Sequence, residues 1–181
     1  MDARLPAVFL AGLLLGFTAF ALLPQGQEGK TCLNGSIETV FSPGVGEDFI
    51  DFIDSAEESV EVEMYVFSYT PLAEALSRAQ ERGVRVRVIL ESRISSKQNL
   101  ETMSFLRSKG VEVKWGSLEY SLTHCKFAVV DGKKVFVGST NWSYHAMREN
   151  RESAVFIEDV KVVQEFLKFF EEDWEAAGAG S

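Results

Sequence analysis

The chain has 181 residues, of which 46% are hydrophobic and 25% charged, and its formal net charge is −9 at pH 7. This length suffices for one domain with a buried core, and the charge excludes a uniformly basic surface of the kind that phosphate binding usually uses. The charge is unevenly distributed, because residues 47–63 carry eight acids and no base, whereas residues 78–97 carry six bases and two acids. A basic substrate groove and ordinary solvated helix faces are both compatible with this pattern.

An uncharged stretch near the N-terminus begins at Leu5 and ends at Leu23. It is about long enough to cross a bilayer as a helix and longer than a usual signal-peptide core, so we expect residues 1–23 to be a membrane anchor or else a signal segment. Cleavage after Ala21, in a small-x-small pattern, stays open. Arg4 precedes the stretch, and the positive-inside rule then places the following domain outside the cytoplasm, either anchored to the membrane or secreted.

Apolar residues recur at strand or helix spacing along the rest of the chain, after a polar linker over residues 24–36. In chain order we expect a strand over 37–41, a helix over 48–56, a strand over 60–66, a helix between Pro71 and Gly83, a strand over 84–90, a helix over 100–109, strands over 111–115, 127–130 and 135–137, a short helix start over 143–147, a strand over 154–157, and a last helix that Asp159 caps. This alternation is typical of a layered α/β fold.

The strand expected over residues 127–130 is preceded by a nucleophile and a cation. Alternate side chains of a strand share a face, so His124 and Lys126 project together while Cys125 points away. An imidazole and an ammonium group can therefore meet one substrate. A hairpin signal at Asp131 then turns the chain back toward them.

The returning strand brings a second group of polar residues beside His124, namely Gly138, Ser139 and Asn141. A phosphodiester must have its non-bridging oxygens neutralised as charge moves onto them. Lys126, the amide of Asn141 and the hydroxyl of Ser139 can do this. Gly138 permits close approach of the backbone. Simple turn chemistry is the alternative for Ser139 and Asn141.

The spacing of these residues resembles the HxK(x)4D(x)6GSxN signature of the phospholipase D superfamily. The matched positions are His124, Lys126, Asp131, Gly138, Ser139 and Asn141, and the family's downstream acid in an Asn-x-Glu context is matched at Glu152. The chain has one copy of the motif, which resembles the single-motif branch of bacterial Nuc-like endonucleases and mitochondrial cardiolipin hydrolase-like phosphodiesterases. The resemblance implies a layered α-β-α sandwich with a central mixed sheet over residues 37–176, preceded by one N-terminal hydrophobic helix.

The resemblance also implies a metal-independent phosphodiesterase without a cofactor, an endonuclease that cleaves DNA and/or RNA through a phosphohistidine intermediate. His124 can attack phosphorus only as neutral imidazole, and the resemblance assigns Glu152 the role of holding its other ring nitrogen. Lys126 and Asn141 complete the expected catalytic set. Asp131 suits a turn or ion-pair role, so we expect it to support the motif structurally, together with Gly138.

In-line displacement requires a proton donor opposite His124. The chain has only two histidines, so this acid is either His145 of the same chain or His124 of a second copy. His145 has the setting of a surface residue at a helix start. We therefore expect a homodimer, because a two-fold axis generates nucleophile and acid from identical residues.

Nucleic acid is the leading substrate, but the residues leave alternatives open. The same chemistry could cleave a phospholipid, as a membrane-associated phospholipase D or cardiolipin hydrolase, and an N-terminal anchor would hold the site near lipid. A catalytically silent phosphate-binding protein is an alternative of a different class. DNA against RNA, strand preference and physiological role stay undecided.

The cysteines and histidines are too few to provide the ligands of a structural zinc site, so we expect no metal. Cys32 and Cys125 could pair in an oxidising compartment. For Cys125 we favour the role of a small buried hydrophobic residue.

Overall fold

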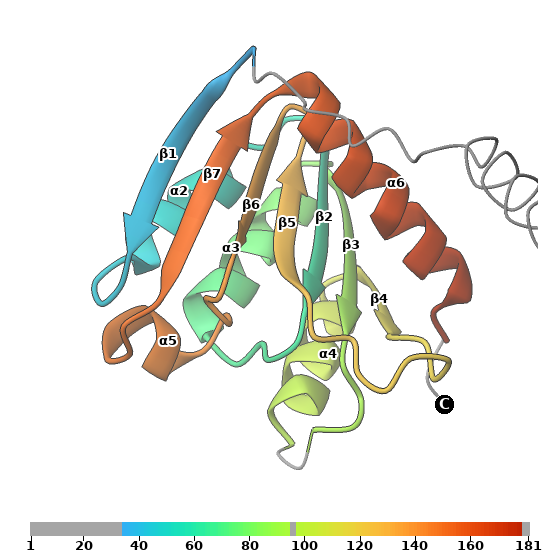
Figure 1. Cartoon of the computed structure of the whole chain (residues 1–181). Helices are drawn as coiled ribbons and strands as arrows, with labels where there is room; N and C mark the ends of the chain where they lie inside the picture. The colour runs from blue at the N-terminus through green and yellow to red at the C-terminus, as the bar shows by residue number, and fades with distance from the viewer. Residues whose placement is uncertain (1–33, 95–96, 179–181) are drawn as a thin grey trace, which may run out of the picture. The chain divides into compact units, whose positions relative to one another are not determined.

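A mixed β-sheet of seven strands, in the order β1-β7-β6-β5-β2-β3-β4, is the centre of the fold (Figure 1). The computed structural model describes residues 34–94 and 97–178. The pairs β2–β3 and β3–β4 are parallel, and all other neighbouring strands are antiparallel. The strands are β1 (Ser36–Phe41), β2 (Ser59–Met64), β3 (Arg85–Leu90), β4 (Glu112–Trp115), β5 (Lys126–Val130), β6 (Lys134–Gly138) and β7 (Ser153–Glu158).

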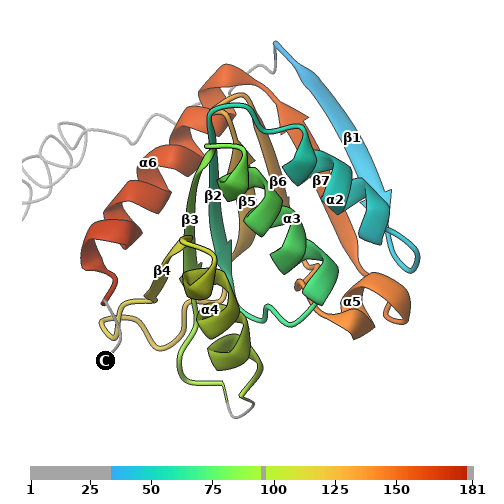
Figure 2. The ribbon, with the colours of Figure 1, turned by 180° about the vertical axis from the view of Figure 1, so that it is seen from behind.

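Helices cover both faces of this sheet. They are α2 (Gly46–Asp54), α3 (Thr70–Glu81), α4 (Gln98–Ser108), α5 (Tyr144–Arg148) and α6 (Val160–Ala176). Helices α2, α3 and α4 lie on one face, and among the described helices only α6 crosses the other (Figures 1 and 2). The expected α-β-α sandwich with a mixed sheet is therefore confirmed.

The segment expected to be an anchor or signal, residues 1–23, lies outside the described residues, and so does the linker up to residue 33. Within the described ranges, none of the helices has the length and apolar character needed to span a bilayer.

The alternation of side chains along β2 separates the two layers of the core. Val60, Val62 and Met64 are fully buried in the larger apolar cluster, under α2, α3 and α4. Glu61 and Glu63 point to the opposite face and are also fully buried, because α6 covers them. The guanidinium of Arg87 joins Glu61 to Glu171 of α6, so this second layer contains ion pairs as well as apolar side chains.

Helix α6 begins where the sequence predicts. The Asp159 carboxylate accepts hydrogen bonds from the backbone N–H groups of Lys161 at 3.0 Å and Val162 at 3.1 Å, which satisfies the first free donors of the helix. Val163 and Phe170 are fully buried against the sheet. Helix α6 is therefore held in place at its start by the Asp159 cap and along its length by its buried apolar face.

The antiparallel register brings the motif together at one edge of the sheet. Met64 pairs with Lys126, Phe127 with Val137, and Gly138 with Ala154. The end of β2, the start of β5, the end of β6 and the start of β7 consequently lie side by side, at the lower edge in Figure 1.

Candidate active site

His124 and Lys126 form the centre of the site, at the start of β5. Lys126 Nζ lies 3.3 Å from Nδ1 of His124 and donates a hydrogen bond to the His124 carbonyl oxygen at 3.0 Å. The Lys126 residue is only 9% exposed. The shared face expected for these two side chains is therefore what the structure shows, and Cys125 instead packs into the cluster beneath α6.

The surroundings of the pair shift the pKa of both groups downward. Burial, and then the positive charge of Lys126, lower the pKa of His124 below its ordinary value. Burial lowers the pKa of Lys126 as well, while Cys125 and Glu152 act in the opposite direction. The lowered pKa favours the neutral imidazole, which is the form that can attack phosphorus.

Asn141 lies at the end of the β6 turn and closes the site toward β2. Its Oδ1 accepts a hydrogen bond from the backbone N–H of Val66 at 3.2 Å. The amide NH2 group is thereby left as the donor that can face a substrate. The neighbouring carbonyl of Trp142 accepts from Ser68 at 2.7 Å and Tyr69 at 2.9 Å, so the turn is fastened to the chain after β2. Because the backbone after β2 bonds to this turn, the strand ends at Met64 and not at residue 66, the expected end.

Gly138 lets β6 approach β7 closely. A Cβ atom added to it would lie 2.4 Å from the carbonyl oxygen of Ser153 and 2.6 Å from Cα of Ala154, so a side chain does not fit without a shift of the backbone. Ser139 follows, and its Oγ donates to Glu152 Oε2 at 2.6 Å.

The hydrogen bonds of Glu152 go to residues other than His124. Besides Ser139, its carboxylate accepts from Nδ2 of Asn150 at 3.0 Å, and its backbone N–H donates to Ser42 Oγ at 2.8 Å. The reason is the strand order, since β6 lies between β7 and β5 and adjacent strands are about 4.8 Å apart. Among the described residues, Nδ1 of His124 faces Lys126 rather than the carboxylate that the resemblance assigns to it.

Asp131 lies at the far end of the hairpin. Its Oδ1 accepts from the backbone N–H groups of Glu58 at 2.7 Å and Ser59 at 2.9 Å. Although burial opposes the change, these backbone hydrogen bonds lower the pKa of Asp131. The carboxylate thus links the hairpin to the start of β2. This is the edge of the sheet opposite the candidate site.

Two residues that support the site were not identified from the sequence. The fully buried carboxylate of Glu91 accepts a hydrogen bond from the backbone N–H of Thr123 at 2.6 Å and from Nε of Arg93 at 2.8 Å, and so holds the chain immediately before His124. Asn99 Nδ2 donates to the carbonyls of Tyr65 and Glu91, both at 2.8 Å. The sequence feature that could have pointed to Glu91 is its position as an acidic residue directly after the apolar strand β3.

His145 and Cys125 have no part in this arrangement. Nδ1 of His145 lies 2.5 Å from Glu149, and the His145 side chain is 72% exposed. Burial, and then the nearby Glu63, raise the pKa of the Cys125 thiol to about 12, so the thiol stays protonated. Cys32 lies outside the described residues. Over residues 34–94 and 97–178, no three His, Cys, Asp or Glu side chains are grouped so that they could hold a metal ion.

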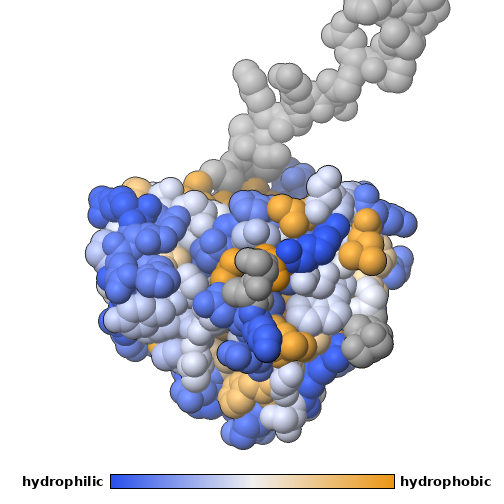
Figure 3. All heavy atoms as spheres, turned by 90° about the horizontal axis from the view of Figure 1, so that it is seen from below, coloured by the Kyte–Doolittle hydropathy of each residue, from blue (hydrophilic) through white to orange (hydrophobic). Residues whose placement is uncertain are grey.

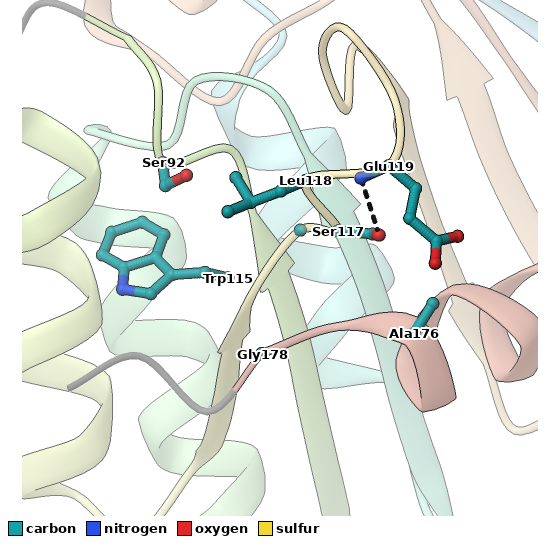
Figure 4. Close-up of a pocket in the computed structure, with 8 residues that line it drawn as sticks. Ser92, Trp115, Ser117, Leu118, Glu119, Ala176 and Gly178 are labelled. Carbon is teal, nitrogen blue, oxygen red and sulfur yellow. Dashed lines mark hydrogen bonds between the residues drawn. The ribbon is translucent and has the colours of Figure 1, made fainter.

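A groove runs from the His124–Lys126 pair between the sheet and α6. It has a volume of about 470 Å³ and is lined mainly by apolar side chains, among them Phe127, Val137, Phe166 and Phe169. The end of the domain that carries the site shows polar side chains with separate apolar patches (Figure 3). A second hollow of about 600 Å³ lies between the chain after β4 and the end of α6, with Trp115, Leu118 and Gly178 in its lining (Figure 4). None of the motif residues lines it.

Comparison with known proteins places this geometry among relatives. The family model described as "Cardiolipin synthase, PLD-like domain" matches residues 49–174. Mitochondrial cardiolipin hydrolase of Mus musculus is 33% identical over 153 residues, which cover 84% of this chain and 66% of that protein. Phospholipase D of Rickettsia felis is 33% identical over 138 residues, covering 75% of this chain and 68% of that protein. The chain thus spans about two thirds of the length of these relatives.

Solved structures agree with these matches. Nuc from Salmonella typhimurium, a phospholipase D family member, has a TM-score of 0.75 and 26% identity and covers 80% of this chain and 97% of that chain. NucT from Helicobacter pylori has a TM-score of 0.70 at 22% identity, covering 79% of this chain and 98% of that chain, and shows the likeness of fold alone.

Proposed function

This chain belongs to the family of phospholipase D-like domains, and from that premise we propose that it is a metal-independent phosphodiesterase, an endonuclease that cleaves DNA and/or RNA. The observation that carries the proposal is the pair formed by His124 and Lys126, an imidazole with a lowered pKa and a buried ammonium group 3.3 Å from its Nδ1. At the same sheet edge, the amide of Asn141 supplies further donors for phosphate oxygens, and the Ser139 hydroxyl can do so when it gives up its hydrogen bond to Glu152. Each role that neutralises charge therefore has a protein side chain, and no cofactor is part of the proposal.

The reaction proceeds in two displacements at phosphorus. Nε2 of His124 forms a P–N bond while the bond to the leaving oxygen breaks, and a proton passes to that oxygen from an imidazolium on the opposite side. A water oxygen then attacks phosphorus, the P–N bond breaks, and the opposite imidazole takes the proton from the water. Lys126 and the amide of Asn141 stabilise the non-bridging oxygens in both steps.

A homodimer supplies the opposite imidazole, as His124 of a second copy. Three large apolar side chains in the segment before His124 are exposed, Leu118 by 76%, Tyr120 by 54% and Leu122 by 43%. A second copy that placed its own His124 across the pocket would cover such side chains. This supports an interface at that edge of the sheet, with the symmetry of an isologous dimer.

The second copy also explains how His124 acquires the required tautomer. Attack by Nε2 needs the proton on Nδ1 and an acceptor for it, but in one chain Nδ1 faces Lys126. Glu152 of the same chain is separated from His124 by β6, and its carboxylate, which accepts from Ser139 and Asn150, still has acceptor sites for a further donor. We assign the acceptor to Glu152 of the second copy, which the two-fold axis brings to the same pocket.

Mixed dimers test this assignment. A His124→Ala chain is paired with a Glu152→Gln chain and assayed on a diester with a good leaving group, which departs without a proton. If Glu152 acts across the dimer, the one intact His124 is oriented by the one intact Glu152. The first displacement, measured as the initial burst of leaving group, should then approach half the wild-type rate, whereas turnover stays slow because the opposite base is missing. A burst no faster than that of a Glu152→Gln homodimer would overturn the assignment.

The function itself is tested by offering single-stranded DNA, duplex DNA and RNA to the purified full-length chain in excess EDTA. We expect cleavage to persist in the chelator and to vanish in His124→Ala, whereas His145→Ala should keep it. Activity that EDTA abolishes and a divalent ion restores would contradict the metal-independent mechanism. Binding of these nucleic acids without any cleavage would favour the silent phosphate-binding alternative.

A phospholipid is the second candidate substrate, because the groove that starts at His124 is lined by Phe127, Phe166 and Phe169 and could hold an acyl chain. The mouse relative is named a mitochondrial cardiolipin hydrolase, which is in line with this candidate. Anionic phospholipid vesicles in the same assay decide between the two. Headgroup release without cleavage of nucleic acid would make phospholipid the substrate in place of nucleic acid. For either substrate, we propose that the protein is membrane-anchored or secreted and that its catalytic domain is extracytoplasmic.

A further inference from the structure

Tyr65, which directly follows β2, touches both members of the central pair. Its ring centroid lies 4.3 Å from that of the His124 imidazole, with an angle of 49° between the ring planes. Lys126 Nζ lies 4.9 Å from the same tyrosine centroid. One aromatic ring is thus in contact with the imidazole and within cation–π distance of the ammonium group.

The backbone of Tyr65 is fixed on both sides. Its N–H donates to the carbonyl of Cys125 at 2.9 Å, and its carbonyl accepts from Nδ2 of the buried Asn99 at 2.8 Å. The first bond continues the pairing of β2 with β5, and the second links the chain to α4. The ring therefore has a defined position relative to His124, which lies next to Cys125.

We propose that Tyr65 is a positioning residue that holds the His124 imidazole and the Lys126 ammonium in their reactive arrangement. The inference deepens the proposed function, because it concerns the same pair and the same reaction. Tyr65 acts through these two side chains and needs no contact with the substrate.

An aromatic ring suits this position better than a carboxylate would. Within the described part of the chain, Lys126 forms no ion pair, and its hydrogen bonds go to His124. A neighbouring carboxylate would neutralise the cation that has to meet a phosphate. The face of Tyr65 stabilises the ammonium group without cancelling its charge, and it likewise stabilises the positive charge that His124 acquires as phosphohistidine or imidazolium.

The contact can be measured without any assay of activity. The full-length chain in detergent micelles is labelled at histidine and tyrosine, and a His145→Gln variant identifies the two histidine signals by NMR. We expect nuclear Overhauser contacts between the rings of Tyr65 and His124, a ring-current shift of the His124 protons, and a His124 pKa below about 6.5. Absence of these contacts in the wild-type protein would overturn the inference, whether or not any variant folds.

Two substitutions separate the ring from its hydroxyl. Tyr65→Leu keeps the site buried but removes the aromatic face that favours the charged imidazole, so it should lower the pKa of His124 further and shift the acidic limb of kcat downward in pH. It should also lower kcat on bis(p-nitrophenyl) phosphate about three- to tenfold with little change in KM. Tyr65→Phe should restore all three. The matched control is Tyr144→Leu, because Tyr144 adjoins His145, with ring centroids 6.1 Å apart, and its loss should leave His124 unaffected.

The outcomes distinguish this inference from the proposed function. A wild-type protein that shows the ring contact and the low His124 pKa but cleaves no diester refutes the proposed function and leaves Tyr65 as a residue that positions His124 and Lys126. A wild-type protein that cleaves diesters, with unchanged pKa and kcat in Tyr65→Leu, refutes the inference alone.

Discussion

Glu63 should make the stability of the fold fall as pH rises. Its carboxyl group is fully buried beneath α6, beside the Cys125 thiol and the Asp173 carboxyl group. Burial, and then the negative charge of Asp173, raise the pKa of Glu63 from 4.5 to about 8. The folded protein thus keeps a proton that the unfolded chain releases, so the associated stability is full below about pH 4.5 and is lost as pH rises through about pH 8.

The size of this effect follows from the shift. One pKa unit corresponds to about 1.4 kcal/mol, so the preference of the fold for the protonated carboxyl group is worth about 5 kcal/mol. Domains of this kind have a total stability of about 5–15 kcal/mol. The substitution Glu63→Gln keeps the shape and removes the titration. It should therefore match the wild type near pH 5 and exceed it by several kcal/mol near pH 9, apart from the smaller titration of Asp173, whose pKa burial also raises.

Urea denaturation followed by tryptophan fluorescence, at pH values from about 5 to 9, measures this free energy of unfolding. Glu61→Gln is the matched control, because Glu61 lies on the same face of β2 and is equally buried but pairs with Arg87 at 3.2 Å. Removing a partner of a buried ion pair costs about 3–5 kcal/mol, and here the loss should be present at every pH. Parallel curves of stability against pH for the wild type and Glu63→Gln would refute the reasoning.

Three further substitutions test the scaffold of the site. Gly138→Ala should destabilise the fold by more than about 1 kcal/mol, because the added Cβ would lie 2.4 Å from the Ser153 carbonyl oxygen; an unchanged melting temperature would contradict this. Asp131→Ala should cost about 1–3 kcal/mol at neutral pH and less in acid, since the pKa of this carboxyl is lowered and its stabilisation is lost as pH falls; a diester kcat that drops with it would assign Asp131 to the chemistry instead. Glu91→Ala should lower kcat together with stability, because it frees the Thr123 N–H that holds the segment before His124; wild-type kinetics in this variant would show that the hydrogen bond is dispensable.

The hairpin that carries the motif could be predicted because its geometry is local. Alternation along β5 fixes which side chains share a face, and the turn at Asp131 fixes the register that returns Gly138, Ser139 and Asn141 to His124. Both steps depend on residues close in sequence. The strand and helix order was predicted correctly for the same reason, with boundaries that differ by a few residues.

The supports of the site could not be predicted, because they join distant parts of the chain through side chain to backbone bonds. Glu91 and Thr123 are 32 positions apart, as are Asn99 and Phe67, whose N–H donates to Oδ1 of Asn99 at 2.8 Å. The buried acids of β2 are another case. Alternation places Glu61 and Glu63 opposite the apolar face, which suggests a solvated surface, and only the position of α6 shows that they are covered.

The two faces of β5 connect catalysis to this buried acid. Cys125 lies between His124 and Lys126 in sequence, and its thiol faces Glu63 on the other side of the sheet. As pH rises through about 8, Glu63 gains a negative charge beneath the strand that carries the catalytic pair, and this charge weakens the docking of α6. A loss of activity in alkali can therefore come from Lys126, whose pKa burial lowers, or from loosening of the layer beneath it. Glu63→Gln separates the two causes, since it removes the second and leaves the titration of Lys126 in place.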